Sequence, residues 1–394
     1  GGKDLVVIGH LGAEVTIIDA QGGSRAVNFD DGETGAAVFR GFTVTGCAAG
    51  GAIRISAGSA PQIRDCVIEG NDAFGANGAG IASLAASPAI NGCTIVANST
   101  GGGGGGLYLA GGAPSVTDCT IIGNQADGRG GGVWITDGAT VTITSSTIAA
   151  NAANLGATGV NGGGLITTGP SAVTVTRSII WGNTADLVDD ILAGAGSTVN
   201  LVCSLYDATG SAGPGTILPD GTTLTESPRF CYPAYGSGAP WTFGDFTLAA
   251  NSPAAPANSP CGLLIGSQPV GCGDLVVWTG AGGNALWSDA LNWSSGAVPD
   301  STSFVQITRG SVVIDQDAAV AQLIQDSESG APDSLLITNG ATLAYNAVSF
   351  PDKADVEKSS YQVKKVVADG EILYPCLPIC PGGVGCPDMC EDLP

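Results

Sequence analysis

Two hexapeptides decide the fold, Cys93-Thr94-Ile95-Val96-Ala97-Asn98 and Cys119-Thr120-Ile121-Ile122-Gly123-Asn124. Each begins with cysteine, continues through β-branched residues and ends in asparagine. The pattern recurs at residues 66–71, 146–151 and 178–183, the last two with serine in place of cysteine. Self-similarity at a period of roughly 20–50 residues is the signature of a solenoid. We therefore expect short parallel strands that stack coil upon coil.

Equivalent residues of successive coils lie above one another, about 4.8 Å apart. The residue two places before each aliphatic position has the same parity, so both columns are expected to face inward. The aliphatic column is Val44, Ile68, Ile95, Ile121, Ile148, Ile180 and Leu205, and the column before it is Phe42, Cys66, Cys93, Cys119, Ser146, Ser178 and Cys203. The glycine-rich stretch before each following strand is expected to turn a corner with positive φ.

Asparagine ends each of the five repeats. The residues are Asn71, Asn98, Asn124, Asn151 and Asn183. Asparagine tolerates the left-handed conformation, and its amide can bond the amides above and below it. A ligand-binding ladder is the functional alternative. Because every coil carries the residue, we interpret the row as a stack that stabilises the turns.

Composition and charge bound the classes of protein. The chain of 394 residues has 63 glycines, 44% hydrophobic residues and abundant Val, Ile and Thr, which favours an all-β fold. Its net charge of −22, with only 13 Lys and Arg, argues against binding to nucleic acid or to an anionic membrane surface. No apolar run is long enough for a transmembrane helix. We expect an exported, extracellular or cell-surface protein that begins at a mature or trimmed N-terminus. The alternative is a cytosolic chain cut for study.

The repeats resemble those of bacterial secreted proteins with a right-handed parallel β-helix, an architecture related to pectin-degrading enzymes. Residues 15–22 and 41–46 resemble the usual first coils of such proteins, and residues 228–231, 244–248, 251–254 and 264–266 resemble their closing segment. The resemblance covers roughly residues 1–272. Because Pro, Gly and Ser become frequent between Gly210 and Pro269, we expect the β-helix over residues 1–210 and a closing cap over 211–272. It says little about function, because this scaffold hosts lyases, hydrolases, adhesins and inert fibres.

The last third of the chain has a different pattern. Residues 273–350, with Trp278, Trp287 and Trp293, resemble a β module of bacterial surface and autotransporter-like proteins. The three tryptophans are expected to form the module's core, with stacking on a sugar ring as the alternative. The tail, residues 351–394, contains a strand-like segment at 361–367 and four cysteines.

Ten of the twelve cysteines fall into three groups. The tail residues Cys376, Cys380, Cys386 and Cys390 are expected to form disulfides, because the spacer between the pairs is short for a structural zinc site. Cys231, Cys261 and Cys272 are candidates for disulfides in the cap. Cys66, Cys93 and Cys119 stack on adjacent coils, where either free thiols or a disulfide would fit.

No catalytic constellation is visible. The single histidine, His10, has no recognisable triad partner. For polysaccharide hydrolysis, Asp65 and Asp118 occupy the same coil position with Glu69 nearby, and Arg64 and Arg129 are the bases open to a lyase. Two acidic loops could bind calcium, with solvated loops as the alternative. Their residues are Asp30, Asp31, Glu33, Asp186, Asp189 and Asp190.

The leading hypothesis is a non-enzymatic extracellular structural protein, a surface or filament subunit that assembles with copies of itself. A β-helix exposes a strand edge at each end, so subunits could join head to tail through these edges and the C-terminal tail. The alternative hypothesis is a cell-surface protein that binds or cleaves glycans. An adhesin passenger is a third, weaker option.

Overall fold

The computed structural model describes residues 3–153, 161–233, 239–240, 244–307 and 312–320, and the strand segments 322–325, 335–337, 343–345, 366–368 and 371–373. The chain divides into two compact units, Gly1–Cys272 and Gly273–Pro394. Among the described residues, no helix has both the length and the apolar character needed to cross a membrane.

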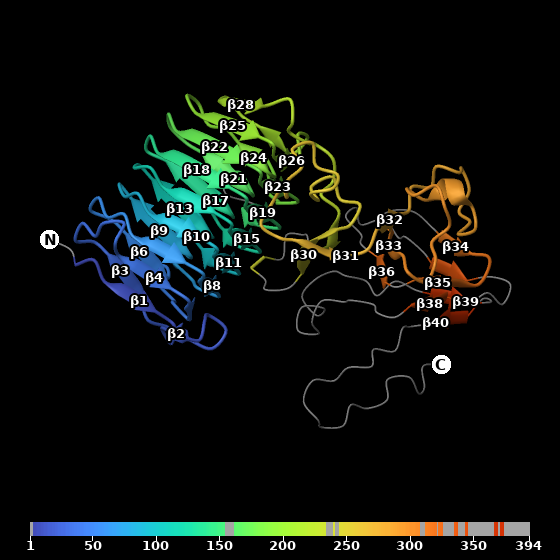
Figure 1. The fold of residues 1–394 in the computed structure, drawn as a ribbon, viewed down its shortest axis with the longest axis horizontal. Coiled ribbons are helices and arrows are strands. Elements are labelled where there is room, and N and C mark those ends of the chain that lie inside the picture. The colour runs from blue at the N-terminus through green and yellow to red at the C-terminus, as the bar shows by residue number, and fades with distance from the viewer. Residues whose placement is uncertain are drawn as a thin grey trace, which may run out of the picture. The chain divides into compact units, whose positions relative to one another are not determined.

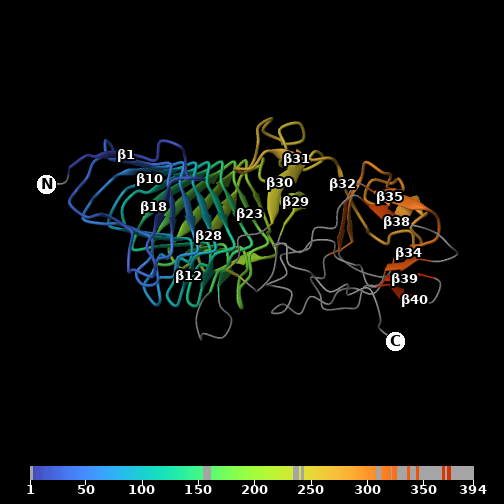
Figure 2. The same ribbon diagram turned by 90° about the horizontal axis from the view of Figure 1, so that it is seen from below.

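The first unit is a parallel β-helix built from three sheets, as Figures 1 and 2 show. Sheet A contains β1 (Val6–Ile8), β4 (Val38–Arg40), β7 (Gln62–Arg64), β10 (Ala89–Asn91), β14 (Ser115–Thr117), β18 (Thr140–Thr144), β22 (Ala172–Thr176), β25 (Thr198–Val202) and β28 (Thr216–Pro219). Sheet B contains β2 (Ile17–Asp19), β5 (Thr43–Thr45), β8 (Val67–Glu69), β11 (Thr94–Val96), β15 (Thr120–Ile122), β19 (Thr147–Ala149), β23 (Ile179–Trp181) and β26 (Leu205–Tyr206). The predicted fold class is therefore confirmed.

Sheet C closes the coil. It contains β3 (Val27–Phe29), β6 (Ile53–Ile55), β9 (Ile81–Leu84), β13 (Leu107–Ala110), β17 (Val133–Thr136), β21 (Leu165–Thr167), β24 (Ile191–Leu192) and β27 (Ser211–Ala212). A short fourth sheet joins β12 (Ser99–Thr100), β16 (Gln125–Ala126) and β20 (Ala152–Ala153). Neighbouring strands of each sheet are parallel and one coil apart, which is the arrangement that the repeat predicts.

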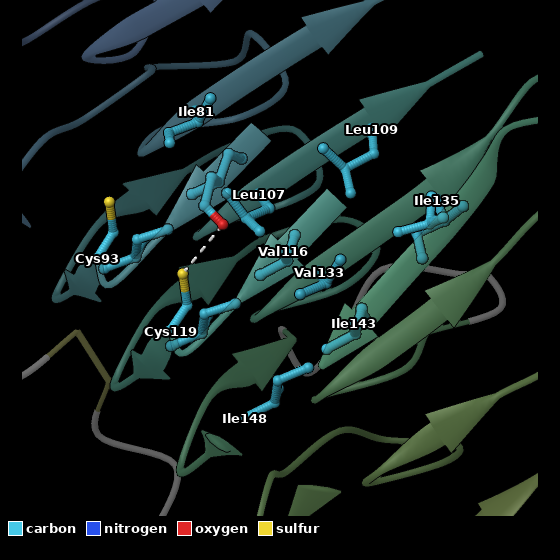
Figure 3. Close-up of a cluster of buried hydrophobic side chains, with 14 of the residues drawn as sticks. Ile81, Cys93, Leu107, Leu109, Val116, Cys119, Val133, Ile135, Ile143 and Ile148 are labelled. Carbon is cyan, nitrogen blue, oxygen red and sulfur yellow. Dashed lines mark hydrogen bonds between the residues drawn. The ribbon is translucent and has the colours of Figure 1, made fainter. Parts of the chain in front are cut away.

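The core follows the predicted columns through most of the β-helix. Ile68, Ile95 and Ile121 lie in register and are fully buried. Cys93 and Cys119 lie beside them among inward-facing aliphatic residues of all three sheets (Figure 3). These thiols are free, as are those of Cys47 and Cys66, and all four are buried. The cysteine column therefore packs as small hydrophobic side chains.

The predicted columns are wrong at their last member. Ile180 pairs with Tyr206, and Leu205 pairs with Ile179, so both columns shift by one residue in the final coil. Ser204 takes the inward position beneath Ser178, whose backbone N–H bonds the Ser204 hydroxyl at 3.2 Å. Cys203 instead occupies the corner before the strand, with a φ of 47°, and forms a disulfide with Cys261. The physical reason is that the disulfide needs an outward-facing thiol.

The glycine-rich stretches have two purposes rather than the one predicted. Gly104 has a positive φ of 71°, as expected for a corner. Gly105 and Gly106 lack a positive φ, but a Cβ atom at these positions would lie 2.4 Å from the Gln125 carbonyl oxygen and 2.7 Å from that of Gly132. These two glycines are needed because the backbone of the next coil approaches so closely.

The segment after the last coils folds back along the β-helix. It contains β29 (Phe230–Tyr232), β30 (Asp245–Ala249) and β31 (Val270–Cys272). Phe230, Phe246 and Leu248 pack on outward-facing residues of sheet B, among them Ile122 and Ile179. The Cys203–Cys261 disulfide ties this segment to the β-helix, and the Cys231–Cys272 disulfide closes the segment itself.

The second unit is a small β module whose strands pair mainly in parallel. Its sheets contain β32 (Leu275–Val277), β33 (Phe304–Ile307) and β36 (Gln322–Gln325); β34 (Val312–Ile314), β37 (Leu335–Ile337), β39 (Val366–Ala368) and β40 (Glu371–Leu373); and β35 (Ala318–Val320) with β38 (Leu343–Tyr345). A 3₁₀ turn, η1 (Ala290–Asn292), follows β32. The tail does not hold a free strand, because β39 pairs with β37 of the module. The four tail cysteines lie outside the described residues.

Candidate functional site

The asparagine row is a continuous internal ladder. Asn98 Nδ2 donates to Asn124 Oδ1 at 2.9 Å, and Asn124 Nδ2 donates to Asn151 Oδ1 at the same distance. The backbone N–H of each asparagine also donates to the next amide oxygen, at 3.0 Å in both cases. All five asparagines are buried. Their amides therefore bind protein groups, and the ladder presents no surface to a ligand.

The ladder ends on a buried carboxylate. Asn183 Nδ2 donates to Asp190 Oδ1 at 2.6 Å, and the backbone N–H of Asn183 donates to the same oxygen at 3.0 Å. Asp190 is 1% exposed. Burial raises its pKa to about 8, against the lowering by the Asn183 hydrogen bonds, and the charges of Asp207 and Asp189 raise the pKa further. Asp190, a candidate calcium ligand, thus forms the last step of the ladder.

Asp190→Asn is expected to change how stability depends on pH. Between about pH 4 and pH 8 the folded protein holds a proton on Asp190 that the unfolded chain releases, so stability falls as pH rises through this window. The slope from one group is at most about 1.4 kcal/mol per pH unit. The asparagine keeps the acceptor for Asn183 without the titration. Urea unfolding at pH 5, 6, 7 and 8 should show the variant gaining stability relative to wild type at each step, whereas parallel profiles would contradict the assignment.

The other candidate calcium ligands do not gather. Asp30 and Asp31 are exposed, and the Glu33 carboxylate accepts a hydrogen bond from the Ser59 hydroxyl at 2.8 Å. Asp189 accepts one from the backbone N–H of Ala185 at 2.8 Å, and Asp186 is exposed. Within the described residues, no group of three or more His, Cys, Asp and Glu side chains could hold a metal ion.

The carboxylates considered for glycan cleavage are corner residues. Asp65 and Asp118 have φ values of 48° and 51° and share their column with Gly41, Gly92 and Cys203, all with positive φ. Asp65 forms an ion pair with Arg40 at 2.7 Å. Aspartate is one of the residues that tolerate this left-handed corner, which accounts for their periodic placement. His10 lies exposed in a turn.

The three tryptophans of the second unit form its core. Trp287 and Trp293 are at most 2% exposed, and the Trp293 indole N–H donates to the Trp287 carbonyl oxygen at 2.8 Å. The rings meet edge to face, with centroids 4.6 Å apart for Trp287 and Trp293 and 4.9 Å apart for Trp278 and Trp293. Rings packed in this way have no free face for a sugar.

The outer face of sheet C carries a different set of side chains. The strand register places Arg54, Ala82, Tyr108 and Trp134 in one outward column. Tyr108 and Trp134 contact each other with ring centroids 4.8 Å apart. The Trp134 indole N–H donates to the Thr168 hydroxyl at 2.8 Å, and the Arg129 guanidinium lies 5.6 Å from the indole centroid. Arg129, considered above as a base, is therefore placed against an aromatic ring.

A pocket of about 190 Å³ opens beside this column. Its lining residues are Arg25, Gly50, Arg54, Ala76, Asn77, Ala82, Leu84 and Tyr108. Arg25 is anchored by donation from Nε and Nη2 to the Gly50 carbonyl oxygen, at 3.2 Å and 2.9 Å. Burial and the neighbouring charge of Arg54 lower the pKa of Arg25. The two guanidinium groups therefore repel each other in the same pocket.

The remaining polar groups of the pocket are also hydrogen-bond donors. Asn77 Oδ1 is occupied, because it accepts from the backbone N–H of Gly103 at 3.0 Å. Burial raises the pKa of Tyr108, so its hydroxyl stays neutral at physiological pH. Neither Arg25 nor Arg54 forms an ion pair among the described residues, although the charge of Asp30 acts on Arg25 at longer range and raises its pKa. We call Arg25, Arg54, Asn77 and Tyr108 the arginine pocket.

Comparison with known proteins agrees with this geometry. Residues 14–202 match the family model of a right handed beta helix region. No curated protein and no solved structure matches the chain. The matched residues of the β-helix include the arginine pocket and the asparagine ladder, but the match specifies no ligand for either.

Sequence reasoning missed the arginine pocket. Arg25 and Arg54 lie 29 residues apart, about one coil, and Asn77 and Tyr108 come from the next two coils of the β-helix. One periodic signal was available in the sequence. Tyr108 and Trp134 each stand two residues after the last corner glycine of their coil and occupy equivalent positions. Aligning the outward positions of successive coils, and not only the inward ones, would have placed Arg54, Tyr108 and Trp134 in one column.

Proposed function

We propose that the β-helix is a non-enzymatic protein that binds an acidic saccharide in the arginine pocket. The observation that carries this proposal is the pair Arg25 and Arg54, which share one pocket and form no ion pair among the described residues, in a chain of net charge −22. Like charges held together cost free energy. A bound anion relieves that cost, and arginine binds carboxylates and sulfates through two parallel hydrogen bonds.

The walls of the pocket fit a sugar ring rather than a bare ion. Tyr108 lines the pocket with a small part of its largely buried side chain, while Ala82 and Leu84 contribute apolar surface. Trp134 extends the same column by one coil. Saccharides have both polar edges and apolar faces, and aromatic rings with a polar group suit such ligands. A uronic acid or sulfated sugar therefore matches both the charge and the walls.

Two disulfides in the first unit support an oxidising surrounding, which is where such polysaccharides are met. On this basis we propose that the protein acts outside the cell, at the cell surface or in its surroundings.

The test is calorimetric titration with a short oligogalacturonate, in which each sugar carries one carboxylate. Arg54→Gln is expected to weaken binding by about ten- to a hundredfold, because a hydrogen bond to a charged group contributes roughly 1.5–3 kcal/mol. Arg64→Gln is the matched control, since Arg64 is an exposed arginine on sheet A. Equal affinity for a neutral glucan, or an equal loss in both variants, would contradict the proposal.

Self-assembly is the second candidate function. Within the described residues, strands β1, β2 and β3 each pair on one side only, and the inward-facing Val7 and Ile18 at this end are still partly exposed, Val7 by 44%. A coil from a second copy could pair with these edges and cover the apolar side chains. Val7→Lys is expected to abolish filaments seen by electron microscopy, because it places a charge in the core that the two copies would share. Dispersed particles in the wild type under all salt conditions would count against assembly.

A further inference from the structure

The outer face of sheet A differs from the rest of the β-helix surface. In β14, β18 and β22 the outward positions are mostly occupied by threonine, in the pattern Ser115-x-Thr117, Thr142-x-Thr144 and Thr174-x-Thr176. The register places Ser115, Thr142 and Thr174 in one column, and Thr117, Thr144 and Thr176 in the next. We call the outward positions of β14, β18, β22 and β25 the threonine face.

The threonine face is a regular two-dimensional array. Its strands pair without a register shift. Outward residues of one strand are therefore about 6.6 Å apart, and neighbouring strands about 4.8 Å apart. Beneath them, Ile143, Val173 and Val175 are fully buried, which holds the strands rigidly against the core. The hydroxyl and methyl groups thus repeat at constant intervals in both directions.

The hydroxyl groups of this face are free to bind outside the protein. In the part of the chain that the structure describes, none of the threonine hydroxyls at positions 117, 142, 144, 174 and 176 takes part in a hydrogen bond with another protein group. Elsewhere on the β-helix, threonine hydroxyls such as those of Thr43 and Thr168 have protein partners. An array of unused hydroxyls on a rigid sheet is complementary to a partner with its own regular hydrogen-bonding lattice.

The face also carries no charge. The outward residues from β10 to β28 are Ala, Asn, Ser, Thr, Val and Leu, although the chain holds 35 Asp and Glu. An uncharged face in so acidic a protein fits an uncharged partner, because a charged one would gain nothing from it. The strands β14 to β25 have no aromatic residue on this face, and so no ring on which a sugar of a crystalline polysaccharide would stack.

We propose that the threonine face binds ice. The hydroxyl groups donate and accept hydrogen bonds to water molecules of the crystal surface. The methyl groups beside them hold the intervening waters in ordered positions, and the rigid sheet keeps both at the constant intervals that its register sets. An ice surface is uncharged, forms hydrogen bonds and is periodic in two dimensions, so it is complementary to the threonine face in all three properties. This binding is independent of the arginine pocket, which lies on sheet C.

The test measures the whole chain at a growing ice surface. Fluorescently labelled protein is frozen slowly on a cold finger, and its incorporation into the ice is compared with that of labelled serum albumin; crystal shape is recorded in a nanolitre osmometer. We expect the wild type to enter the ice and to facet the crystals. Thr142→Lys should reduce incorporation by about tenfold, as expected for a residue at the centre of a binding surface.

The matched control is Val67→Lys, which places the same side chain at a half-buried outward position of β8 in sheet B. It should enter ice as the wild type does. Circular dichroism and thermal unfolding verify that both variants fold. Exclusion of the wild type from ice to the same degree as albumin would overturn the proposal whatever the variants do, and so would an equal loss of incorporation in both variants.

Discussion

Asn124→Ala is expected to lower the free energy of unfolding of the β-helix by about 3 to 4 kcal/mol, near the upper end for a single substitution. Asn124 is fully buried at the centre of the ladder. Its Nδ2 donates to the carbonyl oxygens of Ile95 and Ile122, and its Oδ1 accepts two hydrogen bonds from Asn98. Alanine removes these four hydrogen bonds at once; the Ile122 carbonyl oxygen keeps the Ala97 N–H, and the Asn98 amide keeps the Ile68 carbonyl oxygen. Urea unfolding followed by circular dichroism measures the loss.

The control for this experiment is Asn91→Ala. Asn91 lies at an outward, half-buried position of β10 in sheet A, and its side chain has no hydrogen bond in the described structure. Its removal is expected to change stability by less than about 0.5 kcal/mol, as for ordinary surface substitutions. If the two variants unfold at the same urea concentration, the ladder does not contribute to stability as we infer.

Trp287→Ala is expected to destabilise the second unit by about 3 to 5 kcal/mol, the usual cost of removing a large buried aromatic side chain. Trp287 is fully buried and contacts the Trp293 ring edge to face. Its loss leaves a cavity and removes a face on which Trp293 packs. Hydrogen exchange with mass spectrometry should show faster exchange in peptides from residues 273–320. Peptides from the β-helix should remain protected, because it is a separate compact unit.

Leu291→Ala serves as the control in the same module. Leu291 lies in η1, four residues after Trp287, and is 68% exposed. The substitution removes a large apolar side chain without opening a cavity, so exchange rates should stay close to those of the wild type. Equal protection in the two variants would show that the tryptophan cluster is not the core of the module.

The repeat predicted the inside of the β-helix well because stacking constrains every coil in the same way. Stacking requires apolar residues at Ile68, Ile95 and Ile121 and hydrogen bonds between the asparagines, whatever the conformation of the segments between them. The prediction was wrong where a contact outside the repeat determined the position of a residue. Cys203 left its predicted column because its thiol bonds Cys261, 58 residues further on, and no local pattern records that partner.

Asp190 shows the same limit. From the sequence it resembled a loop carboxylate, because it stands beside Asp189 in an acidic stretch. In the structure the loop after Asn183 folds back, so that Asp190, seven residues later, accepts the two hydrogen bonds that the next asparagine of the ladder would accept. The position of Asp190 depends on the length of this loop, which the repeat does not specify.

The hexapeptides at residues 93–98 and 119–124 thus determined the parallel β-helix, its inward columns and its buried amide ladder. Each of these follows from one coil lying on the next. Only the tertiary structure decided the arginine pocket and the threonine face. Outward positions do not pack in the core, so the stacking rule leaves their residue types free. Which outward residues become neighbours depends on the register between coils, and that register is known only from the complete tertiary structure.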